Sequence, residues 1–240
     1  MTAMRFFLRF CFAAMLIAGN DLAARDMLPL LPASERAKWY AVGAVNAAGF
    51  KTKASCSGAL VAPDLVLTAA HCVDGGAPRH FVAGLALDGH RAHSASAEFM
   101  VHPAYALAKG NARFQYDIAL IRLAEPIAAN LVSPLVVDDR LTAQNGPFSV
   151  VGYSRFRPYL ASGRFDCMRT NGIKSLALYL DCPATSGNSG APVLVQTKDG
   201  WRIVAVLIAT LDQGGSARSL AVPVLDWVVQ EIDKAKQRAN

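Results

Sequence analysis

Several features that would direct the search for a function are missing from this sequence. It has no C-x-x-C pair, no internal repeat of fixed period and no low-complexity linker. Its 24 basic residues outnumber its 18 acidic ones but are scattered rather than clustered in runs, which predicts a solvated basic surface and no nucleic-acid partner. With 53% hydrophobic and 18% charged residues among 240, the chain is neither disordered nor fibrous, and it can bury one large core or two small ones.

The N-terminus lacks an apolar run long enough to span a bilayer. Arg5 and Arg9 precede the short apolar stretch 10–18, and small residues at 18–19 and 23–24 offer two cleavage points. This arrangement is typical of a secretory signal peptide. We therefore predict a signal peptide over 1–24, a secreted or periplasmic protein, and no stable membrane insertion after cleavage. Residues 25–38 are expected to form an N-terminal extension or a short propeptide.

Export makes disulfides the expected role of the cysteines. Removing Cys11 with the signal peptide leaves four cysteines, and an even number in an oxidising compartment suggests two bridges. Their spacing favours Cys56 with Cys72 and Cys167 with Cys182, each closing a loop of roughly 15 residues. A four-cysteine zinc site is the rival interpretation, and the lack of a C-x-x-C pair argues against it. We expect neither a bound metal nor a cofactor.

Apolar runs of strand length recur between Gly, Pro and Asp residues along the body of the chain. Many short strands at this spacing are typical of an all-β sandwich or barrel. Only the tail, 224–235, places apolar residues at helical intervals, and Pro223 just ahead of it is a helix-start signal. A slight boundary near 125–140 suggests two β subdomains. Strands are expected at 41–45, 57–61, 65–68, 81–87, 118–123, 148–152, 191–195 and 203–210.

Three short segments contain the candidate chemistry. An apolar strand runs through 68–70 into His71, and a disulfide at Cys72 would hold the backbone so that this histidine can act as a general base. Asp117 begins another apolar strand, where a carboxylate is costly to bury unless it is paired, and an imidazole N–H is one such partner. In the segment 186–190, glycines on both sides of a serine give a tight turn whose N–H groups can face an oxyanion.

In this order, the three segments resemble the T-A-A-H-C, D-I-A-L and G-x-S-G-x-P signatures of chymotrypsin-like serine peptidases. The resemblance covers roughly 39–232, and it includes Cys56-Ser57-Gly58-Ala59-Leu60-Val61 and Val151-Gly152-Tyr153. It implies an all-β fold of two six-stranded antiparallel Greek-key β-barrels with a C-terminal α-helix. The peptidase domain would span 39–240, with barrels at 39–125 and 140–222 and the helix at 223–240.

The resemblance also implies a role for each residue. Ser189 would be the nucleophile, His71 its base and later the acid for the leaving amine, and Asp117 the group that fixes the histidine tautomer. The N–H groups of Gly187 and Ser189 would form the oxyanion hole. The implied activity is that of a monomeric serine endopeptidase that forms an acyl-enzyme with a protein or peptide substrate. The alternative is a catalytically silent chymotrypsin-fold binding protein of the cell envelope.

Two departures place the chain within this class. Members that are activated by burying a new N-terminal ammonium carry Asp immediately before the serine, whereas this sequence has Asn188, and it has no I-V-G-G start. A neutral amide cannot form that ion pair, so any maturation is expected to proceed without it. Both features resemble the bacterial glutamyl-endopeptidase-like branch, which carries G-N-S-G.

The specificity pocket is expected to be uncharged. In this class its walls come from residues just before the serine and from a strand after it, which here gives Pro183, Ala184, Leu207, Ile208 and Thr210. Pro183 stands where trypsin-like members keep an Asp, and Leu207 stands near the position where glutamate-specific members keep a His. Because neither charge is present, we expect cleavage after small or medium uncharged residues.

Overall fold

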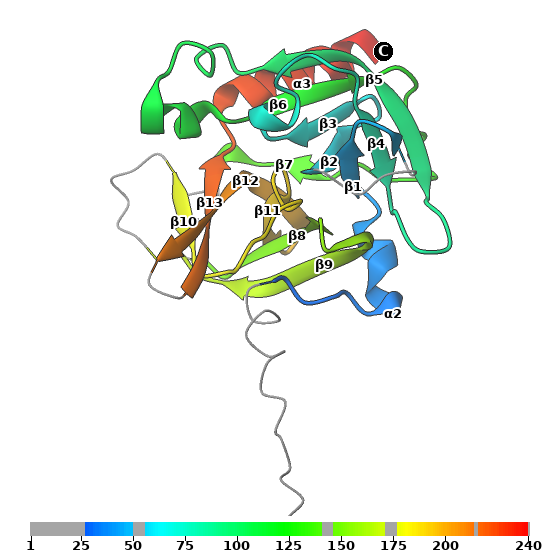
Figure 1. Cartoon of the computed structure of the whole chain (residues 1–240). Coiled ribbons are helices and arrows are strands. Elements are labelled where there is room, and N and C mark those ends of the chain that lie inside the picture. The colour runs from blue at the N-terminus through cyan, green and yellow to red at the C-terminus, as the bar shows by residue number, and fades with distance from the viewer. Residues whose placement is uncertain (1–26, 50–55, 141–145, 171–176, 214–215, 240) are drawn as a thin grey trace, which may run out of the picture.

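The computed structural model describes residues 27–49, 56–140, 146–170, 177–213 and 216–239. Two β-rich units lie one above the other, with the C-terminal helix α3 against the upper unit (Figure 1). The predicted signal peptide and Cys11 lie outside the described residues.

The upper unit is a closed barrel in the order β1-β2-β3-β6-β5-β4, and every neighbouring pair is antiparallel. Because β4 returns to lie beside β1, the order is that of a Greek key. This confirms the six-stranded barrel that the sequence predicted. Strands β2 and β3 are buried at every position, which explains their unbroken apolar runs. The strands are β1 (Val42–Asn46), β2 (Cys56–Ala62), β3 (Leu65–Thr68), β4 (His80–Ala83), β5 (Ala92–Val101) and β6 (Ala119–Leu123).

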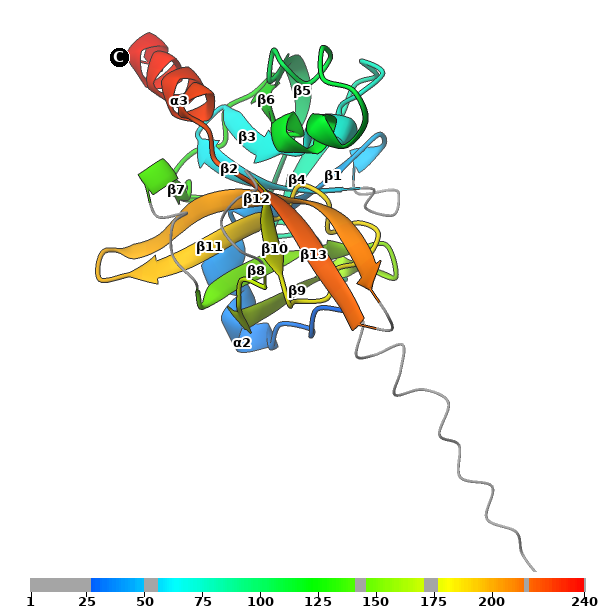
Figure 2. The same cartoon turned by 90° about the vertical axis from the view of Figure 1, so that its left-hand side faces the viewer.

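The lower unit differs in one respect from the antiparallel six-stranded barrel that was expected. Its main path is β10-β13-β12-β11-β8-β9, and the short strand β7 pairs in parallel with β12, which makes the sheet seven-stranded. The seventh strand arises because the connection between the units runs beside β12 (Figure 2). An isolated bridge between Arg169 and Leu180 links the two ends of the path. The strands are β7 (Val136–Val137), β8 (Phe148–Ser154), β9 (Arg157–Cys167), β10 (Leu178–Leu180), β11 (Pro192–Thr197), β12 (Gly200–Gln213) and β13 (Ser216–Pro223).

Among the described residues, helices lie before the first barrel, after the last strand and in two connections of the upper unit. The terminal helix α3 (Asp226–Ala239) begins soon after Pro223, as predicted, and buries Val228 and Ile232. Near the N-terminus are α2 (Ala33–Arg36) and the 3₁₀ helix η1 (Ala37–Trp39); η3 (Ala70–Cys72) and η4 (Gly110–Tyr116) are also 3₁₀ helices. Within the described ranges, none of the helices has the length and apolar character needed to cross a membrane.

The segment before the first barrel packs against the lower unit. The Gly163 N–H donates to the Pro29 carbonyl at 2.8 Å, and the Leu31 N–H donates to the Ala161 carbonyl at 3.0 Å. Leu31 is also buried, at 2% exposure. In Figure 1 this segment and α2 lie beside β9. The predicted extension is therefore part of the folded body from residue 27 onward.

Both predicted disulfides are present. Cys56 on β2 is bonded to Cys72 in η3, and Cys167 on β9 is bonded to Cys182 just after β10. They close loops with sequence separations of 16 and 15 residues. The first bridge fixes the segment that follows β3, and the second fixes the segment that leads to Ser189.

Candidate active site

His71 and Asp117 meet because their strands are paired. His71 lies just after β3 and Asp117 just before β6, and the register sets Thr68 opposite Ala119. One carboxylate oxygen of Asp117 lies 2.7 Å from the His71 ring nitrogen Nδ1, and the other accepts the His71 backbone N–H at 2.8 Å. The carboxylate thus fixes the imidazole at Nδ1 and leaves Nε2 on the opposite side of the ring.

The two side chains differ in exposure in a way that suits proton transfer. The Asp117 side chain is only 6% exposed, whereas that of His71 is 36% exposed. A buried carboxylate must be paired to be tolerated, and both of the hydrogen bonds recorded for Asp117's carboxylate come from His71. Because more than a third of the His71 side chain is exposed, the imidazole is accessible to a substrate.

The third predicted residue, Ser189, lies in a tight turn formed by residues 185–191, here called the serine turn. The Asn188 N–H donates to the Thr185 carbonyl, and the Ala191 N–H donates to the Asn188 carbonyl, both at 2.9 Å. Gly187 and Gly190 both have positive φ, at 101° and 82°, which glycine adopts without steric cost.

The serine turn is pressed against the end of β3. A Cβ on Gly190 would lie 2.1 Å from the Ser57 carbonyl oxygen and 2.2 Å from the Thr68 hydroxyl, so only glycine fits. The same Cβ would lie 3.2 Å from the Ala69 nitrogen. Since Ser189 precedes this glycine and His71 closely follows Ala69, the fold brings the predicted serine and the histidine segment to one place.

The predicted oxyanion donors are the N–H groups of Gly187 and Ser189, and the carbonyl of each of these two peptide groups accepts a hydrogen bond. The Ser186 carbonyl accepts the Arg155 N–H at 2.7 Å, and the Asn188 carbonyl accepts the Ala191 N–H at 2.9 Å. In a trans peptide the N–H points opposite to the C=O, so these bonds set the directions of the Gly187 and Ser189 N–H groups. Neither N–H donates a hydrogen bond to any group in the part of the chain that the structure describes.

Asn188 is fully buried, and its amide is satisfied by backbone groups. Its Nδ2 donates to the Tyr153 carbonyl at 3.0 Å, and its Oδ1 accepts the Thr185 N–H at 2.9 Å. The Tyr153 carbonyl requires a donor and the Thr185 N–H requires an acceptor. A side-chain amide supplies both, whereas an ionised carboxylate supplies acceptors alone.

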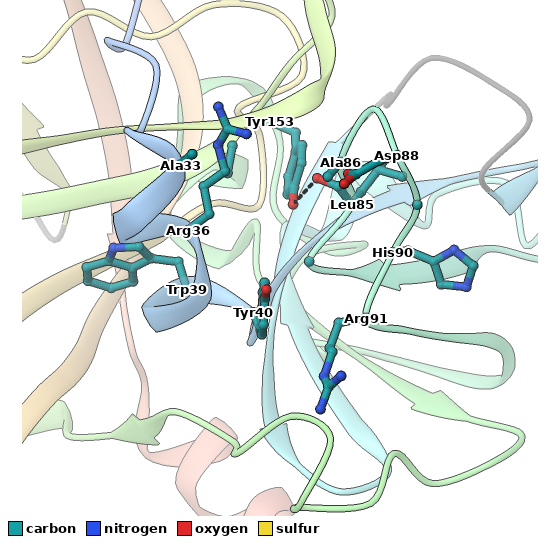
Figure 3. A pocket seen from close by; sticks show the side chains of 13 residues that line it. Ala33, Arg36, Trp39, Tyr40, Leu85, Ala86, Asp88, His90, Arg91 and Tyr153 are labelled. Carbon is teal, nitrogen blue, oxygen red and sulfur yellow. Dashed lines mark hydrogen bonds between the residues drawn. The ribbon is translucent and has the colours of Figure 1, made fainter.

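Tyr153 also connects this region to a separate cavity of about 420 Å³. Figure 3 shows its ring beside Leu85, whose carbonyl accepts the phenol hydrogen at 3.1 Å. Burial raises the pKa of the Tyr153 phenol, so it stays a neutral donor. The residues that line the cavity, including Arg36 and Tyr40, do not include the predicted triad.

The five residues predicted to line the specificity pocket lie in two segments, and a hydrogen bond joins these segments. The Thr210 hydroxyl donates to the Ala184 carbonyl at 2.8 Å, which ties the strand after the serine to the segment before it. The Leu207 carbonyl accepts the Gly190 N–H at 2.7 Å, while its side chain is 1% exposed and belongs to the core. Pro183, Ala184 and Ile208 are buried as well, and Thr210 is the exposed member.

One group in the described ranges has the composition of a metal site, namely Cys56, His71 and Cys72. Both sulfurs are joined in the disulfide, and only a thiolate binds metal. In the disulfide-bonded state the two sulfurs are therefore not available as metal ligands.

Two barrel-like units with a histidine, an aspartate and a serine turn at their junction define the chymotrypsin fold. The family model described as "Trypsin-like peptidase domain" matches residues 56–206. The chain belongs to this family.

Individual relatives match over shorter stretches. Chymotrypsin-like elastase family member 1 of Rattus norvegicus is 33% identical over 110 residues, covering 43% of this chain and 41% of the rat protein. Complement factor B of Bos taurus is 41% identical over 78 residues, covering 30% of this chain and 10% of the bovine protein. The match thus spans less than half the length of either relative.

A solved structure titled "Structure of Glu endopeptidase in complex with MPD" is similar over nearly the whole fold. It superposes with a TM-score of 0.68 at 23% identity, covering 88% of this chain and 98% of that one. At this identity the likeness shows the fold.

Proposed function

We propose that this chain is an exported serine endopeptidase. The observation that carries the proposal is the 2.7 Å contact between His71 Nδ1 and Asp117, beside a serine turn whose Gly190 packs on the end of β3. In the proposal, His71 is the oriented base and Ser189, in the adjacent serine turn, is the nucleophile, which are the parts that acyl transfer requires.

In the proposed reaction, the Ser189 hydroxyl attacks the substrate carbonyl and its proton passes to His71 Nε2. The tetrahedral intermediate carries its negative charge on the former carbonyl oxygen, facing the N–H groups of Gly187 and Ser189. Collapse breaks the C–N bond, and His71 returns the proton to the leaving amine. Water then hydrolyses the acyl-enzyme by the same proton transfers in reverse, while Asp117 stabilises the imidazolium.

The proposed specificity is for small or medium uncharged residues at the cleaved bond. Its support is that the five wall residues contain no charged group and that Thr210 is the exposed member among them. A buried cationic or anionic substrate side chain would find no opposite charge in this wall, and an unpaired buried charge is costly. A peptide-library profile dominated by Lys, Arg or Glu at the cleaved residue would contradict this specificity.

The activity is tested by labelling with a fluorophosphonate. The wild type is expected to be labelled and Ser189→Ala is expected to lose labelling. Ser186→Ala, which changes an exposed serine in the same turn, is the matched control and should keep it. Absence of labelling in the wild type would favour the catalytically silent binding protein.

The proposed setting is outside the cytoplasm, as a monomer without metal or cofactor. The two disulfides support an oxidising compartment. Mass spectrometry of the exported protein should find a new N-terminus near residue 25 and both bridges. An intact N-terminus at Met1 in the exported protein would contradict signal cleavage.

A further inference from the structure

Ser57 is a fully buried residue of β2 that contacts the serine turn from the other unit. Its backbone N–H donates to the Ser189 carbonyl at 2.7 Å. Its hydroxyl donates to the Gly187 carbonyl at 2.9 Å and accepts the Tyr153 N–H at 2.8 Å. One residue of the first barrel thus holds two carbonyls of the segment that carries the proposed nucleophile.

These contacts complete a series along the serine turn. Four successive carbonyls, from Ser186 to Ser189, each accept a hydrogen bond: from Arg155, Ser57, Ala191 and again Ser57. The Gly187 carbonyl belongs to the peptide that lies between the two proposed oxyanion donors. The orientation of this peptide is therefore coupled to both donors. In the described part of the chain, the Gly187 carbonyl accepts its hydrogen bond from the Ser57 hydroxyl.

The acceptor role of this hydroxyl depends on an irregularity in β8. The pairing of β8 with β9 shifts register between Gly152 and Ser154, which leaves the Tyr153 N–H out of the ladder. That N–H turns instead to the Ser57 hydroxyl. A hydroxyl has one proton, and two carbonyls lie within reach of it: that of Gly187 at 2.9 Å and that of Tyr153 at 3.4 Å. The shorter contact assigns the proton to the Gly187 carbonyl.

The Ser57 hydroxyl occupies space that the absence of a side chain at Gly152 leaves open. A Cβ on Gly152 would lie 2.9 Å from the Ser57 hydroxyl oxygen. The Ser57 carbonyl, in turn, accepts the Thr68 hydroxyl at 2.8 Å, and Thr68 is the last residue of β3 before the segment of His71. Ser57 therefore links the histidine segment to the serine turn by direct hydrogen bonds.

We propose that the Ser57 hydroxyl is a positioning residue for the oxyanion hole, holding the Gly187 carbonyl so that the Gly187 and Ser189 N–H groups converge on the tetrahedral intermediate. The inference rests on the proposed peptidase function and assigns to it a residue outside the triad. Loss of the hydroxyl should weaken binding of the transition state while leaving binding of the substrate nearly unchanged.

The test compares Ser57→Ala with Ser94→Ala in steady-state hydrolysis of a peptide substrate found in the library. Alanine at 57 keeps the backbone bond to Ser189 and deletes only the hydroxyl. Ser94 is a matched control, because it is a buried serine of β5 whose hydroxyl accepts the Glu125 N–H at 3.1 Å, far along the chain from the serine turn. Ser57→Ala is expected to lower kcat by about 10-fold or more with KM within about 3-fold, and Ser94→Ala to change neither.

A second pair of variants guards against loss of folding. Ser57→Thr and Ser57→Val have the same shape, so strain from the added methyl groups is common to both, and only threonine keeps the hydroxyl. The threonine variant is expected to exceed the valine variant in kcat and to bind a peptidyl boronate, which forms a tetrahedral adduct, about 10-fold more tightly. Equal kcat and equal boronate affinity in this pair would overturn the role of Ser57.

The outcome for the wild type separates the two proposals. A wild type that neither hydrolyses peptides nor reacts with the fluorophosphonate overturns the peptidase function, and the role of Ser57 falls with it. An active wild type with an unchanged kcat in folded Ser57→Ala overturns the role of Ser57 alone.

Discussion

The side-chain amide of Asn188 donates a hydrogen bond to the Tyr153 carbonyl at 3.0 Å. An aspartate at this position could not donate that bond, and its buried charge would need a cationic partner. Replacing Asn188 with Asp would bury a negative charge against that carbonyl. We expect Asn188→Asp to lower the free energy of unfolding by on the order of 3 kcal/mol at pH 7, measured by urea unfolding.

The penalty should depend on pH. Burial and the facing carbonyl raise the pKa of a carboxyl at this position, because both disfavour its charged form. The loss of stability should therefore be largest near neutral pH and shrink as pH falls and the carboxyl is protonated. Asn130→Asp, at an exposed position, is the control. A wild type whose activity already requires a free N-terminus, and an Asp variant that makes the requirement strict, would contradict this account.

The Asp117 carboxylate receives two hydrogen bonds from His71, and a second prediction follows from their chemistry. In Asp117→Asn, the amide can present its N–H₂ group to His71 Nδ1 and favour the tautomer whose Nε2 carries the proton. That tautomer cannot accept the serine proton, so kcat should fall by about 10³- to 10⁴-fold. Asp64→Asn removes a carboxylate that pairs with Arg122 at 3.1 Å, and it should leave kcat unchanged. Similar losses in both variants would argue against Asp117 as the orienting group.

The sequence predicted strands whose positions are nearly all buried, and it missed, among others, β5 and the very short strands β7 and β10. Strands β2, β3 and β6 were found because nearly every position is buried. Strand β5 was missed because its exposed and half-buried positions, such as His93 and Glu98, break the apolar run. Strand β7 has only two residues, and its pairing depends on the path of the connection between units, which no local pattern encodes.

The site residues also differ in whether a local motif or a contact between distant parts of the chain identifies them. His71, Asp117 and Ser189 stand in short motifs, so the sequence named them. Ser57 and Tyr153 were noticed only as parts of a motif, because their contact joins residues that are 96 positions apart and needs a bulge in β8. A polar residue inside the apolar run of β2 is a signal that could have pointed to Ser57, but it was not used to predict this residue.

The two disulfides allow a paired prediction, because their loops are nearly equal in length. Removing either bridge by a double Cys→Ala change should lower the free energy of unfolding by about 3 kcal/mol. The Cys56–Cys72 variant should also lose more kcat, because Cys72 adjoins His71 and Cys56 adjoins Ser57. The Cys167–Cys182 variant should affect KM more, because Cys182 precedes Pro183, which is proposed to line the specificity pocket. Urea unfolding combined with steady-state kinetics tests this, and equal kinetic effects of the two changes would refute it.

His102 gives the chain a stability that depends on pH in the mildly acidic range. Burial lowers the pKa of its imidazole below the ordinary value of 6.5. The imidazole packs against the rings of Tyr116 and Trp227, at centroid distances of 5.1 and 5.4 Å. Its Nδ1 accepts the Ala104 N–H at 3.2 Å, which requires that nitrogen to be unprotonated. The folded state therefore favours the neutral ring.

The sign of the effect follows from proton linkage. Where the folded pKa is depressed, the unfolded chain binds more protons, so the stabilisation is present above pH 6.5 and is lost as pH falls through the folded pKa. His102→Asn keeps an acceptor near the position of Nδ1 and removes the titrating group. Urea unfolding between about pH 7 and 5 should show a smaller loss of stability in His102→Asn than in the wild type. His93, whose pKa is lowered by burial and by His80 and His90, contributes in the same direction, so the slope should decrease without vanishing; an unchanged slope would exclude His102 as a source.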